Sequence, residues 1–211
     1  MKKIDITTWK RREHFAFFAR MDYPQFNICF DLDITGILPY VRREGLAFYQ
    51  TMIYLSTLSA NAVEEFRYRL RDGEVVLHDE LRPSFTDIDK GSDLFRMVAA
   101  DMKPTLREFV TAARAKSAAQ KEYFPAADFI GKDDYIYYTS IPWISFTHLS
   151  HTISLNKNDS VPRISWGRYY EREGRTYLPY SVQVHHSFAD GIHIGRYKEK
   201  LEEIMKMIER L

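Results

Sequence analysis

Hydrophobic and polar residues alternate strictly over residues 27–35 of the chain. Successive side chains of a β-strand point to opposite faces, so this alternation predicts a half-buried strand with one apolar face. Apolar residues then recur at mostly three- and four-residue spacing from about residue 37 to residue 63, which predicts a long helix directly after the strand. Gly45 lies inside this stretch and is a candidate interruption, because glycine is a weak helix former.

The middle of the chain has the composition of short strands followed by a helix. Residues 74–79 and 84–88 are bounded by turn signals and predict two strands. Residues 94–121 are mainly helical in composition, and we expect Asp93 to cap this helix.

The last part of the chain predicts a hairpin and a closing helix. Residues 135–146 are rich in β-formers, and residues 163–170 and 175–184 form a hairpin pattern around Glu-Arg-Glu-Gly. From Ile194 to Ile208 an apolar stripe repeats at helical spacing. Elements mixed in this order predict an α/β fold, a two-layer sandwich in which helices cover a mixed β-sheet.

The composition is typical of one globular domain spanning residues 1–211. Apolar residues make up 45% of the chain and charged residues 28%, which excludes a disordered protein. The 30 basic and 29 acidic residues nearly cancel, so no global field favours nucleic acid or a membrane surface. Cys29 is the one cysteine, and the sequence contains neither an export signal nor an apolar membrane span. We therefore expect a soluble cytoplasmic protein.

The segment Ser-Val-Gln-Val-His-His-Ser-Phe-Ala-Asp-Gly, residues 181–191, is the most informative part of the sequence. In a strand, His186 shares the face of two valines and points inward at the strand end, where Asp190-Gly191 signals a turn. The unperturbed pKa of imidazole is about 6.5, so a shielded histidine here can act as a general base toward a hydroxyl. A histidine after two valines can equally be a satisfied core residue, and the pattern leaves both interpretations open.

A metal site is a third interpretation of this segment. His185, His186, Asp190 and His193 lie within nine residues, and these are metal-ligand types. Adjacent strand residues face opposite sides, however, so the first two histidines do not easily share one ion. No second cluster of cysteine or glutamate is present in the sequence, and we expect no metal.

The motif His186-Ser-Phe-Ala-Asp190-Gly191 resembles the His-x-x-x-Asp-Gly signature of the CoA-dependent acyltransferase superfamily, and the residues before it resemble chloramphenicol acetyltransferases nearly residue for residue. The likeness covers almost the whole chain and implies the fold of that family, with acetyl-CoA as co-substrate. The other matching segments are Trp9-Lys-Arg-Arg-Glu-His-Phe15, Asp33-Ile-Thr35, Phe48-Tyr49, Met52-Ile-Tyr-Leu55, Pro142-Trp143 and the closing helix.

The resemblance implies catalytic roles for four residues. His186 would be the general base, and Asp190 would pair with Arg11 to hold the histidine loop in shape. Thr139 stands where the family has a serine that donates a hydrogen bond to the oxyanion of the intermediate. From the sequence alone, Arg11 reads as half of an exposed basic pair, and Thr139 as an ordinary strand threonine.

The resemblance also implies a CoA site. Tyr49, Trp143 and Tyr169 match the family's contacts to the pantetheine arm and adenine, and Arg168 replaces a lysine that can meet a phosphate. Ser165 replaces a threonine associated with a bound water near the intermediate. Each of these aromatic residues could instead be an ordinary residue of the hydrophobic core.

The predicted acceptor pocket departs from the drug-resistance enzymes of the family. Asp22, His151 and Arg163 replace apolar residues, which favours an acceptor more polar than chloramphenicol unless these groups pair with one another. The pocket residues predicted by the resemblance are Phe18, Asp22, Pro24, Phe26, Phe95, Phe124, Leu149, His151 and Arg163.

The resemblance therefore predicts an acetyl-CoA-dependent O-acetyltransferase that acts on a hydroxyl of chloramphenicol or a related small acceptor. It also implies a homotrimer with its active sites at the subunit interfaces, and a role in antibiotic resistance. Two alternatives stay open: an acyltransferase for a different, more polar acceptor, and a CoA-binding homologue without turnover.

Overall fold

The computed structural model describes residues 1–152, 155 and 158–210. A seven-stranded sheet runs through its middle. The strands are β2 (Gln25–Asp33), β5 (Arg82–Ile88), β6 (Phe95–Ala99), β7 (Tyr135–Ile141), β8 (Arg163–Gly167), β9 (Tyr170–Arg172) and β10 (Arg175–His185). Their order is β2-β10-β8-β7-β5-β6, with β9 beside β10. Because β7 is parallel to both of its neighbours and the other pairs are antiparallel, the sheet is mixed, as predicted.

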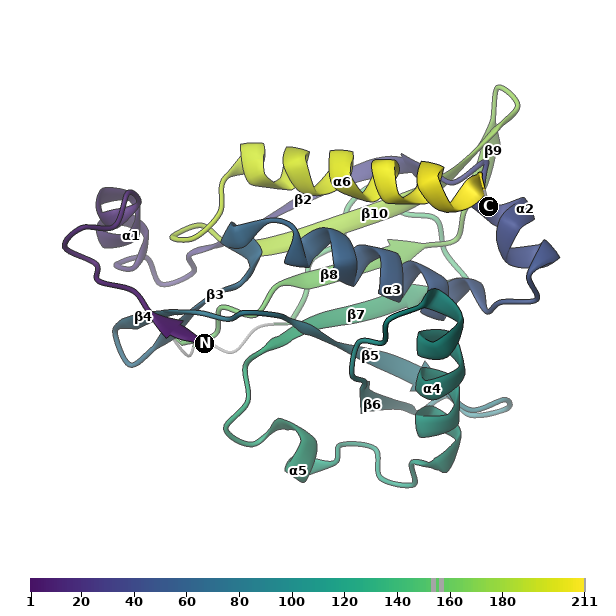
Figure 1. The fold of residues 1–211 in the computed structure, drawn as a ribbon, viewed down its shortest axis with the longest axis horizontal. Helices are drawn as coiled ribbons and strands as arrows, with labels where there is room; N and C mark the ends of the chain where they lie inside the picture. Colours follow the sequence, from purple (N-terminus) through teal and green to yellow (C-terminus); the bar gives the residue numbers. More distant parts are fainter. Residues whose placement is uncertain (153–154, 156–157, 211) are drawn as a thin grey trace.

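Helices lie on one face of this sheet, which confirms the predicted two-layer α/β sandwich. In Figure 1, α6 and α3 run side by side across the sheet, α4 lies next to β5 and β6, and a smaller sheet of β1, β4 and β3 lies toward the left, near the N-terminus. The helices are α1 (Arg12–Phe18), α2 (Ile37–Arg43), α3 (Phe48–Asn61), η1 (Glu64–Phe66), α4 (Leu106–Ala119), α5 (Ala126–Phe129) and α6 (Gly191–Glu209), and the small strands are β1 (Lys2–Lys3), β3 (Tyr68–Arg71) and β4 (Glu74–Leu77).

The closing helix buries the apolar stripe that the sequence predicts. Its Tyr197 and Leu201 are fully buried in the main core. Two tyrosine hydroxyls also enter this core, and both are satisfied: Ser56 Oγ lies 2.8 Å from the Tyr180 hydroxyl and 2.6 Å from that of Tyr197. A hydroxyl buried without a partner would cost about 1–3 kcal/mol, so the triad allows large aromatic rings to fill the space between α3, β10 and α6.

The single helix predicted over residues 37–63 is two helices, α2 and α3. Gly45 lies between them with a φ of +61°, in the left-handed region that glycine enters without a steric penalty. The candidate interruption at this glycine is therefore confirmed.

The helix predicted over residues 94–121 is wrong in its first part. Residues 95–99 form β6, which pairs antiparallel with β5, and the helix begins only at Leu106. Its cap is Thr105 rather than Asp93, because Thr105 and Glu108 form a reciprocal capping box. Residues 95–99 have a composition that suits a helix, but they pair with the free edge of β5 instead. Pro104 lies between β6 and α4.

The predicted late hairpin is present, but its first strand is divided into β8 and β9, and both pair antiparallel with β10. Its turn residues Glu173 and Gly174 both have positive φ, at 52° and 72°, the conformation that suits the right-handed twist of a two-residue hairpin turn. Beyond the hairpin, β10 continues between β8 and β2. The strand that leads to the histidine segment is therefore paired on both sides.

The sheet face opposite the helices carries polar side chains. Thr139, Ser165 and Ser181 are register neighbours across β7, β8 and β10. The chain after β7 crosses over this face, since Asn27 Nδ2 donates to the Leu149 carbonyl at 2.9 Å and Gln25 Nε2 donates to the Asp159 carbonyl at 2.8 Å. This polar face is where the candidate site lies.

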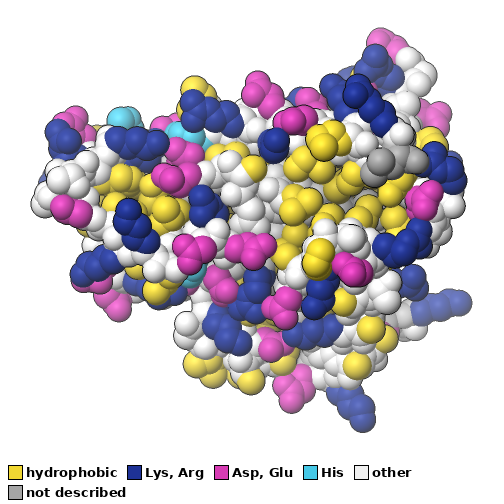
Figure 2. Space-filling view, viewed as in Figure 1, with side chains coloured by type: hydrophobic (Ala, Val, Ile, Leu, Met, Phe, Trp, Pro, Cys, Tyr) yellow, Lys and Arg dark blue, Asp and Glu magenta, His cyan; other side chains and the backbone are white. Residues whose placement is uncertain are grey.

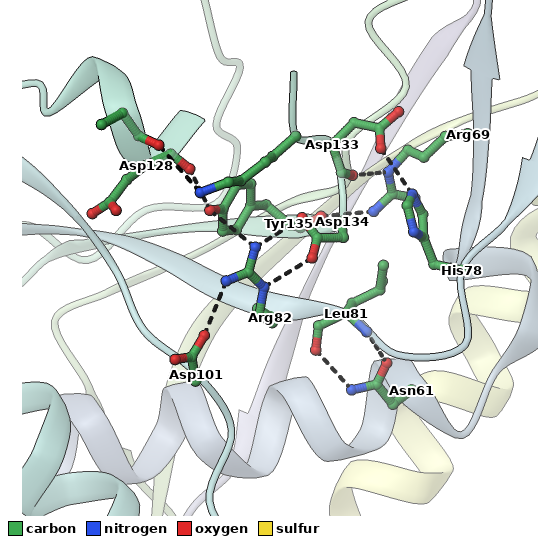
Figure 3. A network of polar contacts seen from close by, with 12 residues as sticks. Asn61, Arg69, His78, Leu81, Arg82, Asp101, Asp128, Asp133, Asp134 and Tyr135 are labelled. Carbon is green, nitrogen blue, oxygen red and sulfur yellow. Dashed lines mark hydrogen bonds and ion pairs between the residues drawn. The ribbon is translucent and has the colours of Figure 1, made fainter. Parts of the chain in front are cut away.

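A buried arginine fastens β3 to the start of β7 (Figure 3). Arg69 is fully buried and donates to four carbonyl oxygens, those of Phe66, Tyr68, Asp133 and Tyr135. Burial lowers its pKa to about 10, so the guanidinium stays charged at neutral pH. Burial alone would raise the pKa of Asp133, but hydrogen bonds from Arg71 and His78 hold it below its usual range. The network fixes the strand that carries Thr139.

Basic and acidic side chains are interspersed on the helix side of the molecule (Figure 2), in keeping with a net charge near zero. Among the described residues, the helices lack the combined length and apolar character that crossing a membrane requires.

Candidate active site

His186 occupies the turn directly after β10. Its backbone N–H donates to the Pro24 carbonyl at 2.7 Å, and its ring stacks on Phe18 at 3.9 Å and lies 4.3 Å from Phe26. One-third of the side chain is exposed, whereas His185 is 3% exposed. The sequence predicted that His186 faces the interior and His185 the opposite side, but His185 is the more deeply buried of the two. Both faces of β10 are covered, and the strand ends one residue earlier than the pattern assumed.

The polar groups around the His186 ring determine which ring nitrogen carries the proton. Nδ1 lies 3.2 Å from the Ala189 carbonyl and 3.2 Å from Asp190 Oδ1, and both are acceptors. A proton on Nδ1 satisfies them, which leaves the lone pair on Nε2. A neutral imidazole held in this tautomer can accept a proton at Nε2, which is the arrangement a general base requires.

Arg11 closes the histidine loop from the N-terminal segment. Its guanidinium donates to Asp190 in a bidentate pair, at 2.7 Å and 3.2 Å, and to the carbonyls of Ser187 at 3.3 Å and His186 at 3.4 Å. Arg11 is 7% exposed, so it is no surface residue. These hydrogen bonds lower the pKa of Asp190, which keeps the carboxylate charged while it orients the ring. The structure brings together the pair that the resemblance implied.

Thr139 lies apart from His186, at a cavity of about 650 Å³ on the β5–β7–β8 side of the sheet. Its hydroxyl is 3.3 Å from that of Thr86. Tyr49 donates to the Thr86 carbonyl at 2.8 Å, and desolvation raises the pKa of its phenol, so it stays neutral. The residues predicted for the site that line this cavity are Tyr49, Phe95, Thr139, Trp143, Arg168 and Tyr169.

Sequence reasoning missed Thr86 and Asp87, which line the same cavity. The pairing of β5 with β7 brings them beside Thr139, and no local pattern signals a parallel pairing between strands so far apart in sequence. Asp87 accepts a hydrogen bond from the buried Ser117 hydroxyl on α4, which anchors this wall of the cavity.

The three polar replacements in the predicted acceptor pocket have different surroundings. Arg163 pairs with Asp159 at 2.6 Å and donates to Gln25 at 3.1 Å, so its charge is neutralised within the chain. His151 Nε2 lies 3.2 Å from the Ser165 hydroxyl, and burial, together with the charge of Arg163, lowers its pKa to about 4. Asp22 is exposed. His151 is thus the replacement that places an uncharged polar ring over the polar face.

The remaining acceptor-pocket residues fall into separate groups. The Pro24 carbonyl accepts from the His186 N–H, and the Leu149 carbonyl accepts from Asn27 Nδ2 on β2. Phe95 and Phe124 pack edge to face at 5.8 Å, and both are about half exposed. These contacts place the predicted pocket residues beside different elements of the chain.

The separation of His186 from Thr139 follows from the strand register. Thr139 is level with Ser165 and Ser181, and Ser181 precedes His186 by five residues, about 16 Å along a strand. In addition, β7 and β10 are two strands apart, about 10 Å across the sheet. Two side chains cannot bridge this separation. The half-site around His186 and the half-site around Thr139 in one chain therefore cannot act on the same reacting group.

His185 gives the fold a specific sensitivity to acid. Its Nδ1 accepts from the Ser187 N–H at 3.3 Å, while Nε2 is buried without a partner among the described residues, and burial lowers its pKa to about 4. The unfolded chain takes up this proton near pH 6.5, so the stability is complete above that pH and falls toward about pH 4. At about pH 5 the expected loss from this residue is about 2 kcal/mol.

Urea unfolding at about pH 7.5 and about pH 5 measures this loss. In His185→Asn, the difference in unfolding free energy between the two pH values should shrink by about 2 kcal/mol. The control His148→Asn, at an exposed histidine, should leave the difference unchanged. An equal pH dependence in wild type and His185→Asn would show that His185 is not the source.

The histidines of residues 185–193 are directed to different partners. His193 uses both ring nitrogens, accepting at Nδ1 from the Asp190 N–H at 2.8 Å and placing Nε2 3.3 Å from Glu65. Within the part of the chain that the structure describes, no three His, Cys, Asp or Glu side chains are grouped so as to hold a metal ion.

Known proteins resemble this chain in sequence and in fold to different degrees. The family model described as chloramphenicol acetyltransferase matches residues 1–202. Chloramphenicol acetyltransferase 2 of Escherichia coli is 32% identical over 203 residues, covering 95% of this chain and 94% of the relative. A solved chloramphenicol acetyltransferase structure superposes with a TM-score of 0.88 at 28% identity, over 97% of this chain and all of the other. The catalytic core of a 2-oxoacid dehydrogenase complex from Thermoplasma acidophilum shares only the fold, with a TM-score of 0.66 at 15% identity over 97% of this chain and 98% of that chain.

Proposed function

The chain belongs to the chloramphenicol acetyltransferase family, and we propose that it moves the acetyl group of acetyl-CoA to a hydroxyl of chloramphenicol or of a related small acceptor. The observation that carries this proposal is the His186 ring, whose Nδ1 faces two acceptors and whose Nε2 is left to take a proton. The Arg11–Asp190 pair supports it by holding the loop that presents the ring.

The reaction proceeds in one ternary complex. Nε2 of His186 takes the proton of the acceptor hydroxyl as its oxygen attacks the thioester carbonyl carbon. The carbonyl oxygen of the tetrahedral intermediate carries the negative charge, and the Thr139 hydroxyl donates to it. As the intermediate collapses, the C–S bond breaks and the CoA sulfur takes the proton from the imidazolium. No acyl-enzyme is formed.

The cavity beside Thr139 is the proposed CoA channel. Tyr49, Trp143 and Tyr169 supply aromatic walls for the pantetheine arm and adenine, and exposed Arg168 supplies a charge for a phosphate. The volume of about 650 Å³ is of the size that elongated cofactors need.

The enzyme is proposed to be a single-domain, cytoplasmic homotrimer. The half-sites of one chain lie too far apart to cooperate, so His186 of one copy must meet the Thr139 cavity of a neighbour. Closed rotational symmetry then repeats the same contact at each interface and completes every site. Dilution until the copies dissociate should therefore abolish turnover.

A thiol-release assay tests the function. Purified protein is mixed with acetyl-CoA, chloramphenicol and a reagent that reacts with free CoA. Release of CoA that requires chloramphenicol supports the proposal. Tight CoA binding without release in the presence of chloramphenicol or a panel of hydroxyl compounds would identify a CoA-binding homologue without turnover.

A more polar acceptor is the second candidate, and the observation that favours it is His151. A neutral imidazole bonded to Ser165 gives the polar face a ring that an apolar acceptor would have to desolvate. If so, His151→Leu should lower the KM for chloramphenicol about tenfold, because one unsatisfied polar group costs about 1–3 kcal/mol.

Steady-state kinetics of His151→Leu and of His151→Asn, which keeps a polar side chain, measure this effect. We expect the lower KM in the leucine variant alone, with kcat within about twofold of wild type. A KM for chloramphenicol in the low micromolar range in wild type, unchanged in His151→Leu, would reject the polar-acceptor candidate.

A further inference from the structure

We propose that Glu65 and His193 form a buried pair that positions the catalytic loop, acting on His186 through the backbone of Asp190. The inference rests on the proposed acetyl transfer for its kinetic test. The pair joins η1 to the start of α6, and neither residue lines the cavity beside Thr139.

The contacts form one continuous chain. Glu65 Oε1 on η1 lies 3.3 Å from His193 Nε2, and His193 Nδ1 accepts from the Asp190 N–H at 2.8 Å. The Asp190 carboxylate in turn lies 3.2 Å from His186 Nδ1 and is held by Arg11. Every link joins adjacent groups, so a change at Glu65 reaches His186 through three contacts.

The pair is buried, so water cannot readily replace a contact that either side chain loses. The side chains of His193 and Glu65 are 8% and 6% exposed. Lys10 Nζ also lies 3.5 Å from Glu65 Oε1, but the Lys10 side chain is 69% exposed. A buried carboxylate and a buried imidazole are each costly without a polar partner, and here the two lie within ion-pair distance of each other.

Glu65 selects the tautomer that the loop needs. Because His193 Nδ1 accepts from the Asp190 N–H, the proton of the neutral ring belongs on Nε2, which faces the Glu65 carboxylate at 3.3 Å. Without that carboxylate the proton can move to Nδ1, and two N–H groups would then face each other at the first turn of α6. The Asp190 backbone would have to move, and the carboxylate that orients His186 would move with it.

The charges around His193 keep the ring in this state. Burial lowers its pKa, Glu65 on η1 and Asp190 at the start of α6 oppose that shift, and Arg11 and Arg196 reinforce it. A doubly protonated ring would break the Asp190 contact, so the loop is intact above the pH at which His193 is protonated and is lost as the pH falls below it.

The test compares Glu65→Ala, which removes the acceptor, with Glu65→Gln, which keeps an oxygen within reach. In Glu65→Ala we expect kcat to fall about tenfold to a hundredfold, since small misplacements of a catalytic group have effects of this size. The KM for acetyl-CoA should stay within about twofold. The acid limb of the kcat/KM profile should move to lower pH, because Glu65 opposes the lowering of the His193 pKa and its removal makes the ring harder to protonate. Glu65→Gln should restore kcat to within about threefold of wild type. Lys10→Ala, which removes the exposed contact to Glu65, is the matched control and should behave as wild type.

A measurement without substrate separates this proposal from the proposed function. In protein with ¹⁵N-labelled histidine, the ring shifts of His193 should report an unprotonated Nδ1 in wild type and Glu65→Gln, and a changed tautomer in Glu65→Ala. If wild type transfers no acetyl group, the function fails while this readout still tests the pair. A folded Glu65→Ala with wild-type kcat, pH profile and ring shifts would overturn the proposal. So would equal damage in Glu65→Gln. If Glu65→Ala does not fold, Glu65→Ser replaces it, because its hydroxyl is too short to reach Nε2.

Discussion

His186→Ala should lower kcat by about ten-thousand-fold, the upper end of what a positioned general base contributes. An alcohol attacks a thioester slowly unless its proton leaves during the attack, and in this chain Nε2 of His186 is the atom prepared to receive it. The substitution removes that atom while the Arg11–Asp190 pair still closes the loop. Thiol release under saturating acetyl-CoA and acceptor measures the change.

The His186→Ala result is interpretable only if the protein still assembles and binds CoA. The ring packs on Phe18 and Phe26, so its loss opens space beside two aromatic side chains. His186→Gln fills most of this space without a base and should be as inactive as the alanine variant. His185→Asn, one residue earlier, should keep most of its activity near neutral pH. A loss of less than about a hundredfold in both His186 variants would show that another group takes the proton.

Much of the fold could be predicted from periodicity because each layer has its own repeat. The alternation around β2 and the stripe of α6 both reflect burial of one face, and the structure confirms both. Periodicity failed at β6, where a segment of helical composition pairs with β5. Pairing between strands is a property of the whole sheet, and a local pattern cannot report it.

The site was predictable in chemistry but only partly in geometry. The turn signal at Asp190-Gly191 correctly placed His186 at a strand end, whereas the direction of its side chain depended on where β10 stops. Arg11 reads as a surface residue in the sequence because nothing local shows that the N-terminal segment returns to the loop. Its partner follows it by 179 positions, so only the resemblance or the fold brings the two together.

Thr139→Ala should lower kcat by about a hundredfold to a thousandfold with little change in either KM. The hydroxyl lies at the cavity wall, 3.3 Å from the Thr86 hydroxyl, so it has a neighbour that can orient it toward developing charge. That charge exists only as the intermediate forms, and a donor lost there raises the barrier without weakening substrate binding. Initial rates at varied acetyl-CoA and acceptor concentrations separate the two effects.

Thr139→Ser is the control that isolates the hydroxyl, because it removes only the methyl group and should retain kcat within about threefold. Thr139→Val keeps the branched shape without the donor and should match the alanine variant. Thr86→Val removes only the neighbour that orients the hydroxyl, so its loss should be smaller than that of either. A serine variant as slow as the valine variant would mean that Thr139 acts through its packing, and the oxyanion would then need another donor at this cavity.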